Sequence, residues 1–163
     1  MTAFSFMPMF VEPIRRGLVS PYPDKAALSP KRQTIRTKRK DGRRPAKAGE
    51  LLQLYCQRRS PGGFLIGEVM CTEVQKIHLF FRGNPSLVEI EGRNLIIAEN
   101  EKGPCRRLNA FARSDGFKDW EHLRRFWKEQ HGLEPFHGWI IYWEPKGGQH
   151  AEKEQTHEQR RQQ

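Results

Sequence analysis

The side chains best suited to chemistry in this chain are cationic, and they begin with the run KRQTIR at residues 31–36. Between Lys31 and Lys47 there are nine Lys or Arg residues and one acid, Asp41, so this stretch has a formal charge of +8. The whole chain carries +10, which leaves the remainder nearly neutral. Clustered cations favour a phosphate-bearing partner, although a basic loop that only keeps the protein soluble would have the same composition.

The basic region continues beyond this run and is accompanied by aromatic residues. Arg58 and Arg59 extend it to a charge of +9 after Glu50 is counted. Exposed aromatic rings beside such cations can stack on bases, and Tyr55 and Phe64 are the candidates here. The predicted nucleic-acid-binding residues are Arg32, Arg36, Lys38, Arg39, Lys40, Arg43, Arg44, Tyr55, Arg58 and Arg59.

Length and composition predict one compact domain. A chain of 163 residues with 36% hydrophobic residues can bury a core without disulfide bonds. Almost nothing apolar follows Pro145, so we expect a domain over residues 1–145 and a disordered charged tail over 146–163. No run approaches the roughly 18 apolar residues of a membrane span, and the apolar N-terminus lacks a basic segment. These features predict a cytoplasmic protein with no membrane partner.

The cysteine and histidine patterns predict neither a metal site nor a cofactor. Cys56, Cys71 and Cys105 lie far apart and are odd in number, which favours a reducing compartment over a disulfide framework. The six histidines show no metal-ligand spacing. The sequence also has no phosphate-binding glycine loop or dinucleotide fingerprint, which argues against chemistry that depends on ATP or NAD.

The hydrophobic pattern predicts mostly strands, with helices in the second half of the chain and one short helical segment near the start. Turn residues separate these elements, and residues 18–30 and 38–47 are expected to be loops. The arrangement predicts an α+β fold: a mostly antiparallel β-barrel or strongly bent sheet, with two or three short helices over one end. Strands are expected over 4–10, 33–37, 50–56, 64–81, 87–97 (a hairpin) and 136–143, and helices over 11–17, 106–113 and 119–131.

Four segments support a more specific interpretation when taken together. They are KRQTIR (31–36), AGELLQLY (48–55), ARSDGFKDWEHL (112–123) and FHGWIIYW (136–143). In order and approximate spacing they resemble the ASCH family, which belongs to the PUA-like superfamily of small β-barrels. The resemblance spans most of residues 4–143. It implies a PUA-like fold with a pocket that faces the basic strand and suits RNA or a modified nucleoside.

The resemblance also implies a set of catalytic residues. Some small ASCH proteins are amidohydrolases that act on acetylcytidine with a Lys, a Thr three residues later and a distal Glu; others are reported as ribonucleases, and many are presumed RNA binders. Carried onto this chain, the Lys and Thr match Lys31 and Thr34, and the Glu position falls at Asp115. Asp115 is shorter by one carbon–carbon bond, about 1.5 Å, and this difference favours binding over that catalysis.

The chemistry of such a triad is reasonable from the residues themselves. A threonine hydroxyl is a weak nucleophile until a base takes its proton, and Lys31 can be that base only in its neutral form. Arg32 and Arg36 favour the neutral form, because neighbouring positive charges disfavour the ammonium ion. Residues three apart in a strand face opposite ways, so Lys31 has to precede the strand in order to reach Thr34.

Each of these residues also has an ordinary structural interpretation. Thr34 is a good strand residue, and Asp115 stands before Gly116, where a turn or a helix cap would use it. Trp120 and Trp127, with Phe126 between them, are expected in the core rather than in a stacking site.

Three functions are compatible with the sequence. The first is a non-catalytic RNA- or nucleotide-binding module that uses a basic cleft around residues 31–59. The second is a small hydrolase, either an amidohydrolase on an acetylated cytidine nucleoside or a ribonuclease, with Lys31, Thr34 and Asp115 as its machinery. The third is an adaptor whose basic loop binds an acidic protein. We favour the first and then the second.

Overall fold

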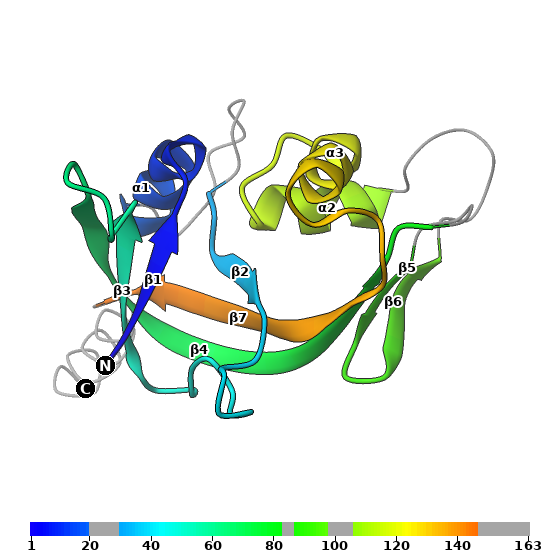
Figure 1. The fold of residues 1–163 in the computed structure, drawn as a ribbon, viewed down its shortest axis with the longest axis horizontal. Helices are drawn as coiled ribbons and strands as arrows, with labels where there is room; N and C mark the ends of the chain where they lie inside the picture. Colours follow the sequence, from blue (N-terminus) through cyan, green and yellow to red (C-terminus); the bar gives the residue numbers. More distant parts are fainter. Residues whose placement is uncertain (20–29, 83–86, 98–105, 147–163) are drawn as a thin grey trace, which may run out of the picture.

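The computed structural model describes residues 1–19, 30–82, 87–97 and 106–146 (Figure 1). Within these residues, one sheet contains seven strands, and three α-helices and a short 3-10 helix accompany it. The predicted α+β class with a mostly antiparallel sheet is confirmed. Most of the loop expected over 18–30, and the tail after residue 146, lie outside the described residues.

The middle of the sheet is formed by three strands. β4 (Phe64–Phe80) pairs antiparallel with β3 (Leu51–Cys56) through residues 64–70 and with the whole of β7 (Phe136–Pro145) through residues 69–79. These strands are rich in the β-branched and aromatic residues that suit a pleated surface. The pairing with β7 shifts register between Cys71 and Glu73, where a bulge lets the strand bend. In Figure 1, β4 and β7 curve together and form a concave face under the helices.

Two short strands form open edges of the bent sheet. β1 (Thr2–Phe6) runs parallel to β3, and β2 (Gln33–Arg36) runs antiparallel to β7. Within the described residues, β1 and β2 do not pair with each other. The predicted closed barrel is therefore wrong, and the alternative of a strongly bent sheet describes the structure. The candidate site lies at this open edge.

The chain after β1 turns into helix earlier than the sequence predicted. The expected strand over 4–10 ends at Phe6, because Pro8 has no backbone N–H to give to a sheet and instead begins a 3-10 helix, η1 (Pro8–Phe10). Helix α1 (Val11–Val19) follows directly and runs past Gly17, where it was expected to stop.

Gly17 has a packing role in α1. A Cβ at this position would lie 2.5 Å from the backbone oxygen of Lys31. The backbone N–H of Lys31 also donates to the oxygen of Pro13 at 2.9 Å. The absence of a side chain at Gly17 therefore lets the segment that leads into β2 lie directly against α1.

A hairpin extends the far end of β4. β5 (Leu87–Ile90) pairs antiparallel with β4 and with β6 (Arg93–Ile97). The turn residues Glu91 and Gly92 both have positive φ, at 49° and 73°. Two successive positive φ angles match the twist of a two-residue hairpin, and the predicted hairpin over 87–97 is confirmed.

Helices α2 (Arg106–Ser114) and α3 (Trp120–His131) cover the concave face of the sheet. The Asp119 carboxylate caps α3 by accepting the N–H of His122 at 2.9 Å. Trp120 and Trp127 are buried in the core as expected. None of the helices within the described residues combines the length and the apolar character that crossing a membrane requires.

Candidate functional site

A cavity of about 310 Å³ lies at the open edge of the sheet, bordered by β1, η1, β2 and the ends of α2 and α3. Lys31, Thr34 and Asp115 all line it. Each of these residues is almost fully buried, with an exposed fraction between 2% and 5%. The structure therefore brings the three residues of the predicted triad to one cavity.

Lys31 is held in the segment that precedes β2. The backbone N–H of Lys31 donates a hydrogen bond to the oxygen of Pro13 in α1. The N–H of Arg32 donates to the oxygen of Ser114 at the end of α2, at 3.1 Å. This segment thus lies between α1 and α2. Lys31 precedes β2, which begins at Gln33. This is the position that Lys31 needs if its side chain is to reach the same side of the strand as Thr34.

Asp115 is positioned by the way α2 ends. Gly116 has a φ of 88°, and its N–H and that of Phe117 donate back to the last turn of α2 at 2.9 and 3.0 Å. This is the Schellman arrangement, which needs glycine in the left-handed conformation. A Cβ on Gly116 would also lie 3.0 Å from Cδ of Lys31. The sequence S-D-G-F therefore fixes both the helix end and the space for the lysine stem.

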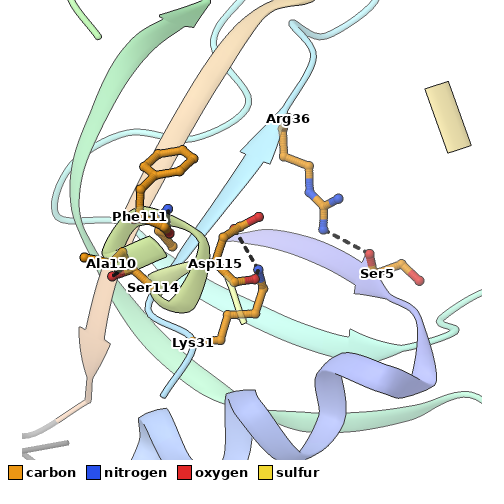
Figure 2. A network of polar contacts seen from close by, with 8 residues as sticks. Ser5, Lys31, Arg36, Ala110, Phe111, Ser114 and Asp115 are labelled. Atoms are coloured by element: carbon orange, nitrogen blue, oxygen red, sulfur yellow. Dashed lines mark hydrogen bonds and ion pairs between the residues drawn. The ribbon is translucent and has the colours of Figure 1, made fainter. Parts of the chain in front are cut away.

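Lys31 and Asp115 form a buried ion pair (Figure 2). The lysine Nζ lies 2.8 Å from Oδ1 of Asp115 and 2.5 Å from its backbone oxygen. The same Nζ lies 4.7 Å from the ring centre of Phe10, which adds a cation–π contact. One side chain thus neutralises the carboxylate and satisfies a carbonyl at the end of α2.

Burial is the main influence on the charges of this pair. It lowers the pKa of Lys31 and raises the pKa of Asp115, while the attraction between the two groups opposes both shifts. Arg36 also lowers the pKa of Lys31, but it is the smallest of the contributions. The sequence pointed to neighbouring arginines as the cause, whereas the structure shows that desolvation comes first.

Thr34 lies in β2 opposite Ile141 of β7. Among the described residues, its hydroxyl makes no side-chain hydrogen bond, so it is available to a ligand. Lys31 donates to Asp115 and not to Thr34. Two members of the triad are therefore joined by hydrogen bonds, and the third shares only the cavity.

Arg36 is not on the outer surface, where the basic run suggested a phosphate-binding side chain. It lines the cavity, and its guanidinium lies 4.8 Å from the ring centre of Phe6 and 5.4 Å from that of Phe4. Its Nη2 donates to the backbone oxygen of Ser5 at 3.0 Å (Figure 2). Since Ser5 belongs to β1, the Arg36 side chain bridges the two unpaired edges of the sheet.

The loop after β2 holds the first group of exposed cations. With Thr2 and Trp139, part of this loop lines a second and wider cavity of about 1030 Å³. The Arg44 guanidinium lies 5.5 Å from the Trp139 ring centre. The cations of this group are Lys38, Arg39, Lys40, Arg43 and Arg44, and all five are exposed.

The remaining predicted cations lie elsewhere on the molecule. Arg58 and Arg59 are exposed in the turn after β3, where the N–H of Arg58 donates to the Ser5 hydroxyl and its guanidinium covers the Tyr55 ring. Arg58 thus lies near the end of β1, whereas the loop after β2 lies near Thr2 at its beginning. The exposed cations therefore form two separate groups. Arg32 is half-buried in the segment just before β2.

Sequence reasoning missed the aromatic residues around both cavities, and it expected Phe126 in the core, where the structure has this ring only partly buried. Phe10, Phe117 and Phe126 line the cavity at Lys31 and contact one another edge-to-face or tilted, with ring centres 5.2–5.7 Å apart. Phe117 directly follows the Asp115-Gly116 turn, which is a signal that could have found it. Trp139 had no such signal, because it belongs to a continuously apolar run that suggested burial throughout.

The described residues contain no group of three or more His, Cys, Asp or Glu side chains arranged to hold a metal ion. Comparison with known proteins adds no relative: no family model, no curated protein and no solved structure matches this chain. The resemblance to the ASCH family therefore remains an interpretation that rests on the four sequence segments.

Proposed function

We propose that this protein is an RNA- or nucleotide-binding module of the ASCH and PUA-like type. In this proposal the cavity at Lys31 holds one nucleoside unit, and the exposed loop over residues 38–47 meets phosphates. The observation that carries the proposal is the composition of the cavity, which has aromatic rings, buried Lys31 and half-buried Arg36 around one space. Its volume of about 310 Å³ is at the lower end of the range for small-molecule sites.

The position of the loop supports contact with a longer strand. β2 leads directly from the cavity into the loop, so nucleotides next to one held in the cavity would meet its cations. Lys and Arg bind the phosphate backbone without regard to sequence, and this binding weakens as salt rises. Trp139 beside Arg44 adds an aromatic face on which a base can stack.

The proposal is tested by the affinity for a labelled single-stranded RNA measured over a range of salt concentrations. If about five phosphates are neutralised, log affinity falls against log salt with a slope of roughly −3.5. Replacing Arg43 and Arg44 together with Gln should make this slope shallower. The matched control is Arg125→Gln with Lys128→Gln, which removes two exposed cations from α3. A slope near zero, or an equal effect of the control, contradicts the proposal.

A polyanion separates this proposal from the adaptor alternative. An adaptor for an acidic protein would not distinguish RNA from heparin of similar length, because its basic loop would recognise charge alone. The nucleotide-binding module should prefer RNA, since the cavity and the rings recognise bases. Equal competition by heparin in the same assay therefore favours the adaptor.

The buried pair favours a second candidate, a hydrolase for an acetylated cytidine nucleoside. Thr34 would attack the acyl carbonyl, Lys31 would take the hydroxyl proton and pass it to the departing amine, and water would then release acetate from the acylated threonine. The lowered pKa of buried Lys31 suits the role of base. For this step the Nζ has to move from Asp115 toward Thr34.

The hydrolase candidate is tested with N4-acetylcytidine and single-stranded RNA as separate substrates. Thr34→Val removes the hydroxyl at nearly constant shape and should abolish product formation, while Thr34→Ser should retain part of it. Product formation that survives both Thr34→Val and Lys31→Ala excludes these residues as the catalytic machinery. Absence of product with the unaltered protein leaves the binding module as the function.

A further inference from the structure

Counted over the described residues that line it, the cavity at Lys31 has one positive charge more than it has negative charges. Lys31 and Asp115 form a pair whose total charge is zero, wherever the shared proton resides. Arg36 is the third strongly ionised side chain on the cavity wall. Because a guanidinium is not deprotonated in proteins, the surplus charge is located at Arg36.

The surroundings of Arg36 do not remove this surplus. Of the described acids, Asp115 is the one that acts on the pKa of Arg36, and it is already paired with Lys31. The elements packed against the guanidinium contribute the rings of Phe4 and Phe6 and the backbone oxygen of Ser5, none of which is an anion. The carbonyl end of α2 is engaged by Lys31.

The remaining titratable group of the cavity does not change the balance. His131 lines the wall at the end of α3, and partial burial lowers its pKa from an ordinary value of 6.5. It is therefore mostly neutral at pH 7. Arg36 is half-buried, and the described residues around it supply no unpaired acid, so a ligand that supplies a negative charge gains more here than a neutral one.

Arg36 also has donors to offer. A guanidinium has five N–H groups, and among the described residues the Ser5 oxygen is its one hydrogen-bond acceptor. The rings of Phe4 and Phe6 and the bond to Ser5 fix the orientation of the side chain. A planar, oriented guanidinium matches the paired oxygens of a phosphate better than any other side chain does.

We propose that the cavity selects a ligand with one phosphate group bound by Arg36, and thus a nucleotide rather than a neutral nucleoside. The nucleoside part of this inference rests on the proposed function, whereas the anionic part rests on the charges of the cavity. The phosphate is either the monoester of a free nucleotide or the diester of an RNA strand. Both sources present the same charged oxygens to Arg36.

The test is isothermal titration of the whole chain at pH 7 with cytidine, its 3′- and 5′-monophosphates, and the dinucleotide CpC. At least one phosphorylated ligand should bind about tenfold or more tightly than cytidine, because a charge-assisted bond to the half-buried Arg36 guanidinium adds at least that factor. Tighter binding of the dinucleotide than of either monophosphate indicates an RNA strand as the source. The reverse order indicates a free nucleotide.

Variants at Arg36 connect the preference to this side chain. Arg36→Gln should reduce the affinity ratio of nucleotide to nucleoside to near one, and Arg36→Lys should retain part of it. The matched control is Arg125→Gln, which removes an exposed cation of α3 that does not line the cavity and should leave the ratio unchanged. The ratio is the informative quantity, because Arg36 also bridges β1 and β2 and its loss can lower all affinities together.

The outcomes for the two proposals are distinguishable. If cytidine binds as tightly as its phosphates, the inference about Arg36 is overturned while nucleoside binding in the cavity stands. If none of these ligands binds, both the inference and the nucleoside-binding role of the cavity fail. If Arg36→Gln does not fold, the comparison of cytidine with its phosphates on the unaltered protein still decides the question.

Discussion

The cavity at Lys31 and the loop over residues 38–47 contain the same kinds of side chain in opposite environments. The Lys31 side chain is 2% exposed and paired with a buried carboxylate, whereas the Arg43 side chain is 79% exposed and paired with half-exposed Asp41. Charges in the first setting act strongly and in fixed positions, while those in the second are screened by water and salt. One basic run in the sequence therefore divides into a shaped site and a diffuse positive surface.

The largest expected effect comes from breaking the buried pair on one side only. Lys31→Met leaves Asp115 buried without a cation, and we expect a loss of roughly 3–5 kcal/mol in the free energy of unfolding. Urea denaturation measures this loss. The double variant Lys31→Met with Asp115→Leu removes both charges and should recover most of it. A single variant as stable as the unaltered protein would show that the pair is not buried as described.

A smaller effect is expected at Gly17, which supports the same site from α1. Alanine is the better helix former by about 1 kcal/mol, but its Cβ would lie 2.5 Å from the Lys31 oxygen. We expect the clash to prevail, with a net loss of about 1–3 kcal/mol and weaker ligand binding. Gly62→Ala is a suitable comparison, because nothing lies within 4 Å of a Cβ there and its φ is not in the left-handed range. A stabilised Gly17→Ala protein would contradict the close approach.

The pH dependence of stability distinguishes the two environments further. Burial raises the pKa of Asp115 above its ordinary 3.8, so the folded state binds more protons than the unfolded state just above that pH, and stability falls as pH rises. In Lys31→Met the carboxyl group has lost its cationic partner. The free energy of unfolding should then decrease more steeply with pH, by up to about 1.4 kcal/mol per pH unit, and the decrease should continue to a higher pH. Denaturation between pH 4 and 8 measures it. Parallel curves for variant and parent would contradict this origin.

The smallest effect on stability is expected in the exposed loop. Arg43→Gln should leave the thermal midpoint unchanged, because its contact with Asp41 is in water. The same change should make the salt slope of RNA binding less steep by about 0.7, if Arg43 contacts one phosphate. A clear loss of stability together with an unchanged slope would reverse the roles assigned to the loop and the cavity.

Most elements of the fold could be predicted because their signals are local. Asp119 and Gly132 bound α3, and the long β-rich run became β4 with few changes. Closure of the sheet was beyond such reasoning. Whether β1 meets β2 depends on how far β4 and β7 bend, and that bend accompanies a shift of register between strands far apart in the sequence, which local signals do not specify.

The candidate site could be predicted in part. Side chains alternate along a strand, so Thr34 and Arg36 of β2 share one face, but this alternation alone does not show that the face lines a cavity. Phe4 and Phe6, which cover Arg36, come from a strand about thirty residues earlier. The partnership of Lys31 with Asp115 came only from the family resemblance, since nothing in local spacing connects them.

The contact between Lys31 and Asp115 joins positions 84 residues apart in the chain. Contacts of such long sequence separation close large loops, and they form after local turns and hairpins. The loop cations need no such assembly. A partly folded chain would therefore still adhere to polyanions while being unable to recognise a single nucleotide, so binding to long RNA alone is a poor measure of correct folding.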